Sequence, residues 1–371
     1  MRLAMLGLSL WAGAAAALGQ SGSAAIGLFE GHGDVGTLLQ PGSAEYDAAT
    51  KTYTVGGSGE NMWAKEDDFH FVWRKVTAKN SKNLSLAADI SILGSGGDNH
   101  RKAMLIVRQN LNADSAYADA ALHGNGLTSL QFRETQGEAT HEIESSVSAP
   151  KGLKLEKRGD RFYLWTHGGG RQWQFAGGST KVELEPPFYV GIGVCAHNKN
   201  AFQKAAFTNV DLHVGKLAAE GRYSTLQSIA VASTDALVSY VGQEPLQTAG
   251  WNLNGIALLF YTAGKLQSVP LKGGTPQAVT DENVMKPEPA DAAKGPYSRL
   301  SPDGRQVAFL TFSKEKAGKG NKQDVALSVM SVADKKTRVL AKLVGGPGTL
   351  SANPWSPDGK RITYVSYQDL K

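Results

Sequence analysis

Carboxylates are the first residues in this 371-residue chain whose spacing could support catalysis. Glu142 and Glu144 occupy alternate positions of the predicted strand 140–147, and Glu138 comes just before it. Alternate residues share one face of a strand, so an acid–base pair for glycoside hydrolysis is one interpretation. The polar face of a half-solvated strand is the other, and we favour it because polar and apolar residues alternate there.

Histidines, the single cysteine and the turn carboxylates add no catalytic or metal-binding pattern. None of the eight histidines forms a metal-ligand spacing, and no Gly-x-Ser-x-Gly elbow is present. Cys195 lies in an apolar stretch, which predicts a buried, inert thiol. The turns 98–100 and 112–114 offer oxygen ligands for calcium, although turn residues that bond their own backbone explain them equally. We therefore predict no enzyme activity, no metal site and no cofactor, with calcium as the open alternative.

Aromatic side chains near polar groups indicate a ligand-binding surface instead. Sugar recognition uses flat aromatic faces beside hydrogen-bonding groups, whereas a tryptophan in the core only packs. Trp165 and Trp173 flank the glycine-rich turn 168–170 and are the best candidates for such a platform. The predicted ligand-binding residues are the pair Trp165 and Trp173, the pair Trp63 and Asn61, and the polar set Arg108, Asp119 and His123.

The elements that must position these residues are strands. Glycine makes up 43 of 371 residues, against a usual share of about 7%, which favours many tight turns. Between residues 53 and 213, short runs alternate apolar with polar residues, as in 84–92, and glycine-rich turns separate them. No helical pattern of ten or more residues follows residue 19. We predict a two-sheet antiparallel sandwich over residues 26–214.

The ends of the sandwich mark two further segments. Residues 1–19 join one basic residue to an apolar run and small residues, which predicts a signal peptide rather than a membrane anchor. The mature protein is then periplasmic or secreted, with no membrane span. Residues 215–222 break the strand pattern and are the predicted linker. The net charge of +5 is scattered without interleaved aromatic residues, so nucleic acid is not an expected partner.

Beyond the linker, a turn motif repeats. The sequence Ser-Pro-Asp-Gly occupies 301–304 and 356–359, and a degenerate copy ends at Gly255. Each copy precedes an apolar strand, which we expect to be the inner strand of a propeller blade. The last copy leaves one strand before the chain ends, and we expect the strands 226–232 and 237–241 to complete its blade.

These repeats resemble TolB-like six-bladed propellers over residues 223–371. The stretch 266–279, with Val-Pro-Leu-Lys-Gly-Gly-Thr-Pro, looks like a blade-closing hairpin of that family. Six blades need roughly 250 residues, so the resemblance implies about three blades in an incomplete ring. Such blades either pack on the sandwich or pair with a second copy, which makes a homodimer through the propeller segment.

Residues 26–214 resemble concanavalin-like (laminin-G-type) sandwiches. The motifs that carry this resemblance are 33–36, 55–59, 69–74, 108–119, 123–127 and 189–194. Glucanases of this type carry an aspartate between two strand glutamates, where this chain has Ile143. The two resemblances imply an exported, non-enzymatic binding or scaffold protein of the bacterial cell envelope, whose partner is a glycan or an envelope protein. The alternative is a carbohydrate-active hydrolase that uses the sandwich groove.

Overall fold

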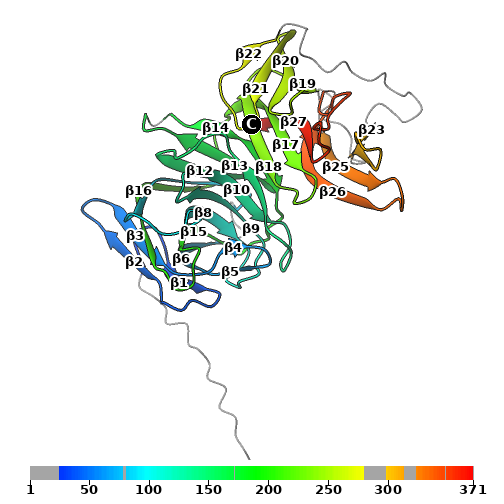
Figure 1. The fold of residues 1–371 in the computed structure, drawn as a ribbon. Helices are drawn as coiled ribbons and strands as arrows, with labels where there is room; N and C mark the ends of the chain where they lie inside the picture. The colour runs from blue at the N-terminus through cyan, green and yellow to red at the C-terminus, as the bar shows by residue number, and fades with distance from the viewer. Residues whose placement is uncertain are drawn as a thin grey trace, which may run out of the picture.

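The computed structural model describes residues 25–77, 81–170, 172–279, 298–312, 323–346 and 348–370. Within these ranges all regular secondary structure is β-strand, in several sheets, none of which closes on itself (Figure 1). The predicted all-β class is thereby confirmed. The predicted signal peptide, residues 1–19, lies outside these ranges. No helix in the described part of the chain is long and apolar enough to cross a membrane.

One sheet of the sandwich is ten-stranded and runs into the C-terminal part of the chain. Its strands, in spatial order, are β1 (Gly31–Val35), β6 (Phe69–Val76), β15 (Phe188–Cys195), β8 (Lys102–Arg108), β9 (Tyr117–His123), β10 (Thr128–Arg133), β11 (His141–Glu144), β18 (Ala236–Gly242), β17 (Gly221–Ala230) and β27 (Arg361–Leu370).

The second sheet of the sandwich is seven-stranded. In spatial order it consists of β14 (Gln174–Lys181), β13 (Arg161–His167), β12 (Gly152–Arg158), β7 (Asn83–Leu93), β16 (Gln203–Val214), β3 (Thr52–Gly57) and β2 (Ser43–Asp47). The alternating residues Leu84, Leu86 and Ala88 of β7 are buried in the core that also contains Leu105 and Val107 of β8. The period of two in the sequence therefore places one face of each sheet in a shared interior.

A short hairpin covers part of the outer face of the ten-stranded sheet. It consists of β4 (Met62–Trp63) and β5 (Glu66–Asp67). Met62 packs with Phe69 and Met104 in a second apolar cluster. Every residue of β8 is buried, because the core covers one face of this strand and the second cluster covers part of the other.

The sandwich and the C-terminal part share one sheet. β16 ends at Val214 and β17 begins at Gly221, so the predicted linker 215–222 includes the first residues of β17. After this connection, β18 pairs in parallel with β11 of the sandwich, with Ile143 opposite Ala236. The sequence did not predict this pairing, which joins the two parts through backbone hydrogen bonds.

Two four-stranded sheets complete the fold. They lie on either side of the group formed by β17, β18 and β27 (Figure 1), and β19 and β26 both contact β27. One consists of β19 (Leu246–Trp251), β20 (Ala257–Thr262), β21 (Lys265–Pro270) and β22 (Gln277–Ala278), and the other of β23 (Ser298–Leu300), β24 (Gln306–Phe312), β25 (Gln323–Ser331) and β26 (Thr337–Gly345). The three groups match the predicted incomplete set of about three blades.

The repeated turns form as their residues predict, and two of them lead into inner strands. Asp303 Oδ1 accepts hydrogen bonds from Ser301 Oγ at 2.6 Å and from the Arg305 amide at 3.0 Å, and Gly304 has φ +71°. β20 and β24, which follow such turns, each pair with a strand on both sides and are inner strands of their sheets, as predicted. β27, which follows the last turn, instead lies at the edge of the ten-stranded sheet.

The last strand closes onto the beginning of the C-terminal part, as predicted. β27 pairs with β17 from Gly221–Leu370 to Ala230–Arg361. Indole hydrogen bonds tie the neighbouring sheets to this group: Trp251 Nε1 donates to the Pro354 carbonyl at 2.9 Å, and Trp355 Nε1 donates to the Arg299 carbonyl at 3.0 Å. The blades are thus held together without a complete ring.

Candidate functional site

Arg108, Asp119 and His123 share one face of the ten-stranded sheet, and Asn61 and Trp63 belong to the hairpin segment beside it. This polar face consists of Lys102, Arg108, Asp119, His123, Gln131, Arg133 and Glu142, which the strand register places on β8, β9, β10 and β11. The sequence predicted Arg108, Asp119 and His123, and the pair Asn61 and Trp63, as neighbours of a ligand. It missed Lys102, Gln131 and Arg133, whose only signal is their alternation with apolar residues in strands.

Asp67 anchors the hairpin to the polar face. Its carboxylate accepts hydrogen bonds from Arg133 Nη2 at 2.8 Å and Nη1 at 2.9 Å, and Arg108 Nη2 lies 3.4 Å away. All three side chains are fully buried. Arg108 also donates to the Asn110 carbonyl at 2.8 Å and to that of Asn112. With no exposed surface, Arg108 serves to hold the loops in place and is not accessible to a ligand.

A second polar group surrounds Lys102. Its ammonium donates to the Met62 carbonyl at 2.9 Å and to Gln131 Oε1 at 3.2 Å, and it lies 5.6 Å from the centre of the Trp63 ring. Gln131 Nε2 donates to Glu142 Oε1 at 3.0 Å. His123 Nε2 lies 4.0 Å from the same oxygen. Burial, followed by the charge of Lys102, lowers the pKa of His123 to about 2, so this imidazole is neutral near pH 7.

Asp119 lies between these groups without a side-chain partner. Both of its carboxylate oxygens are buried, and no described side chain hydrogen-bonds them. Burial raises the pKa of this carboxyl well above its ordinary value. Asn61 Oδ1 is also buried without a partner among the described residues. Buried polar atoms of this kind usually bind ordered water, so the polar face is a place for water molecules.

Trp165 corrects the prediction of a paired aromatic platform. Its side chain is 1% exposed, and its ring packs 5.4 Å from Phe175 and 5.8 Å from Tyr223, centre to centre. Lys154 Nζ lies 4.4 Å from the centre of the same ring. Tyr223 belongs to β17, which covers this part of the seven-stranded sheet. No face of Trp165 is left for a sugar ring.

Trp173, by contrast, lines an open cavity of about 430 Å³ on the outer face of the seven-stranded sheet. Its ring meets His167 edge to face at 4.5 Å, and Lys154 Nζ lies 5.6 Å from its centre. The cavity, called the Trp173 pocket below, is also lined by polar side chains from three strands and the connection to β17, namely Ser85, Lys154, Glu156, Asp211, His213, Lys216 and Glu220.

The charges of the Trp173 pocket are partly satisfied. Lys154 Nζ lies 2.9 Å from Glu156 Oε1 and 3.6 Å from Glu220 Oε1. Asp211 is exposed where it lines the pocket, and no described side chain forms an ion pair with it. The sequence missed these residues, although the alternating polar pairs 154/156 on β12 and 211/213 on β16, the two strands that flank β7, were the available signal. The pocket therefore combines an aromatic wall with a free carboxylate.

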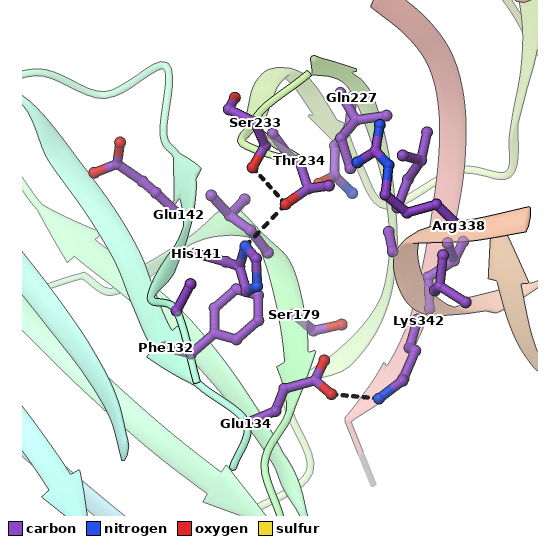
Figure 2. A pocket seen from close by; sticks show the side chains of 18 of the residues that line it. Phe132, Glu134, His141, Glu142, Ser179, Gln227, Ser233, Thr234, Arg338 and Lys342 are labelled. Carbon is purple, nitrogen blue, oxygen red and sulfur yellow. Dashed lines mark hydrogen bonds and ion pairs between the residues drawn. The ribbon is translucent and has the colours of Figure 1, made fainter. Parts of the chain in front are cut away.

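A second cavity, of about 450 Å³, lies where the sandwich meets the blades (Figure 2). β10 and β11 contribute Phe132 and His141, the β17–β18 turn contributes Thr234, and β26 contributes Arg338 and Lys342. His141 Nδ1 and Thr234 Oγ1 are 2.8 Å apart, and Lys342 forms an ion pair with Glu134. We call this space the junction cavity.

The calcium alternative gains no support from the turns. Asp98 Oδ1 accepts the amide hydrogen of His100 at 2.7 Å, and Asn110 Oδ1 accepts that of Asn112 at 3.0 Å. In the described ranges, no three acidic, histidine or cysteine side chains are arranged to hold a metal ion. Cys195 is buried, and burial raises the pKa of its thiol to about 11. These residues support the local fold.

Comparisons with known proteins give partial likenesses. No family model matches the chain. It is 32% identical over 78 residues, 21% of its length, to an uncharacterized protein of Agrobacterium fabrum, and it covers 27% of that protein. The chain thus spans about a quarter of the curated relative that it matches.

Three solved structures are similar to this chain at low identity. A protein of unknown function from Saccharomyces cerevisiae has 13% identity and a TM-score of 0.37, over 47% of this chain and 93% of its own. A "putative TolB" from Agrobacterium tumefaciens has 12% identity and a TM-score of 0.17, over 74% and 99%. Botulinum neurotoxin type C, whose cell entry depends on two ganglioside molecules, has 9% identity and a TM-score of 0.32, over 92% and 88%. With TM-scores below 0.5, a function for this chain depends on its own residues.

Proposed function

We propose that this chain is an exported, non-enzymatic glycan-binding protein of the bacterial cell envelope. The observation that supports this most directly is the Trp173 pocket, an open space of about 430 Å³ in which an indole stands beside carboxylate, hydroxyl and ammonium groups. Neutral sugars present an apolar ring face and a rim of hydroxyl groups. An exposed aromatic ring and nearby polar side chains complement both features at once.

Each residue of the Trp173 pocket has a separate role in binding a sugar. The indole of Trp173 packs against the apolar face of a pyranose ring. Asp211 is the free hydrogen-bond acceptor for its hydroxyl groups, and Ser85 can both donate and accept. Lys154 and Glu156 already satisfy each other at 2.9 Å, so they shape the wall of the pocket without requiring a charged ligand. A neutral sugar is therefore favoured over an acidic one.

The blades have a different part in this proposal. They contact an envelope protein through β19–β22 and β23–β26, whose strands and turns expose the apolar residues Ile256, Tyr261 and Leu300. Burying these side chains against a partner would favour the contact. Residues 1–19 supply the export signal.

A glycan array with the mature full-length chain tests the proposal. The variants Trp173→Ala and Asp211→Asn should each weaken the binding of the glycan by about five-fold or more, since a stacking contact is worth on the order of 1 kcal/mol and a hydrogen bond to a charged group about 1.5–3 kcal/mol. Glu45→Gln, an exposed carboxylate on the edge strand of the same sheet, is the matched control and should bind normally. No glycan bound by the wild-type chain, or equal binding by Trp173→Ala, would refute the proposal.

A hydrolase stays as the second candidate because of two carboxylates on the polar face. Asp119 and Glu142 both register with Gln131, from opposite sides. Strands lie about 4.8 Å apart, so the Cα atoms of these two residues are about 10 Å apart. A reducing-end assay separates the candidates: turnover that falls more than about 100-fold in Glu142→Gln would establish the hydrolase.

A further inference from the structure

The junction cavity is a second candidate ligand site that does not depend on glycan binding. Its walls come from the sandwich and from the blades, and much of their surface is apolar. Phe132 of β10 lies on one side, Ile229 of β17 and Tyr364 of β27 border the cavity, and Leu340 belongs to β26. A cavity of about 450 Å³ is of the size that commonly holds a small organic ligand.

Contacts across the cavity fix its shape before any ligand arrives. His141 Nδ1 and Thr234 Oγ1 are 2.8 Å apart, which connects β11 to the β17–β18 turn. Lys342 of β26 pairs with Glu134 of the sandwich. Thr234 has φ +66°, a conformation that a β-branched residue rarely adopts. The amide of Thr234 donates to the Ala230 carbonyl at 2.9 Å, which helps to hold it there.

The charged side chains that line the cavity are two cations and three carboxylates, namely Arg338, Lys342, Glu134, Glu138 and Glu142. Figure 2 shows Arg338 and Lys342 projecting from β26 into the space that His141, Ser233 and Thr234 border on the opposite side. Glu134 neutralises Lys342. Glu142 points away from the cavity, toward Gln131, and Glu138 is exposed at its rim.

Arg338 is therefore the cation available to a ligand. Its Nη2 donates to the Val231 carbonyl, and a guanidinium group has further donors. Planar pairing with a carboxylate or sulfonate is the interaction for which a guanidinium group is best suited.

We propose that the junction cavity binds a small amphipathic anion, with its carboxylate or sulfonate on Arg338 and its apolar body against Phe132, Ile229 and Leu340. Such a ligand touches the sandwich and the blades together. Its binding stabilises their contact and raises the temperature at which the full chain unfolds. A neutral molecule with the same apolar body leaves the guanidinium group without its partner and binds more weakly.

The test uses the mature full-length chain and the fluorescent anion 8-anilinonaphthalene-1-sulfonate as probe. The wild-type chain should bind one probe molecule per chain in a saturable manner, and nonanoate should displace it far better than 1-nonanol. Arg338→Gln should weaken nonanoate 10- to 100-fold, the usual effect of losing a hydrogen bond to a charged group. Lys336→Gln is the matched control, because this exposed lysine on the approach to β26 pairs with Asp334 outside the cavity.

A second variant separates the cavity from other apolar surfaces. Ala232 is exposed where it lines the cavity, so Ala232→Trp should block the space while the charge of Arg338 remains. This variant should lose probe and nonanoate alike and should unfold at the wild-type temperature. Unchanged nonanoate affinity in Arg338→Gln, unchanged probe binding in Ala232→Trp, or equal displacement by 1-nonanol would each overturn the proposal.

Discussion

Replacing Trp165 by alanine should cost far more stability than replacing Trp173, although the sequence presents the two as a pair. Trp165 is 1% exposed and packs against Phe175, Tyr223 and Lys154. A buried tryptophan that becomes alanine typically costs about 3–5 kcal/mol, because apolar contacts are lost and a cavity remains. For a chain of 371 residues, an unfolding entropy of about 2.1 cal/mol/K per residue means that about 1.3 °C of melting temperature accompanies each kcal/mol, so Trp165→Ala should melt roughly 5 °C lower.

Part of the stability lost in Trp165→Ala comes from the contact between Trp165 and Tyr223, and that part can be measured separately. The two rings meet edge to face at 5.8 Å, and Tyr223 lies in β17, beyond the sandwich. A double-mutant cycle with Trp165→Ala and Tyr223→Ala should give a coupling energy of about 0.5–1.5 kcal/mol. Such coupling would show that the indole stabilises the contact between sandwich and blades as well as the sandwich itself.

Calorimetry and circular dichroism on the mature chain measure both quantities. Trp173→Ala is the matched control, because its indole borders an open cavity and should cost less than about 1.5 kcal/mol. A melting temperature of Trp165→Ala within 2 °C of the wild type would refute the reasoning, since a buried indole cannot be removed at so small a cost.

Three further changes have defined outcomes. Asp67→Asn leaves the guanidinium groups of Arg108 and Arg133 buried without a carboxylate, so urea denaturation should show a loss of about 3–5 kcal/mol, whereas the exposed Glu183→Gln should leave the denaturation midpoint nearly unchanged. Because the folded-state pKa of His123 is lowered to about 2, unfolding takes up a proton below pH 6.5, and the stability difference between wild type and His123→Gln should fall by about 1.4 kcal/mol per pH unit from pH 6.5 to 4.5. A homodimer through residues 223–371 predicts a light-scattering mass of two chains, and a mass of one chain would contradict it.

Local patterns were sufficient to predict the strands and the turns. Alternation in β7 reflects a core on one side of the sheet, and Ser-Pro-Asp-Gly forms its turn from the preferences of its own residues. The closure of β27 on β17 was predictable too, because a lone last strand needs a partner.

Burial created by distant segments could not be read from the sequence. Trp165 is covered by Tyr223, which lies 58 residues later in the chain, and no local feature of the sequence indicates that contact. Lys102 and Arg108 stand at the two ends of the apolar strand β8, where charged residues are usually solvated, but the β4–β5 hairpin covers them. The exposed Asp211 needed the register between β16 and β7 before its place beside Trp173 could be known.

The pairing of β11 with β18 explains how a partial set of blades can be stable. Without this pairing, β11 would end the sandwich sheet and β18 would end the closing group of blades, and each would expose unpaired backbone groups. Each strand covers the edge of the other, with Glu144 opposite Leu237. The ion pairs of Arg161 with Asp324 and of Glu134 with Lys342 add contacts between the sandwich and the last four-stranded sheet. The sandwich thus supplies the strand pairing and side-chain contacts that neighbouring blades would provide in a complete ring. A ligand in the junction cavity would therefore act on a contact that the fold requires.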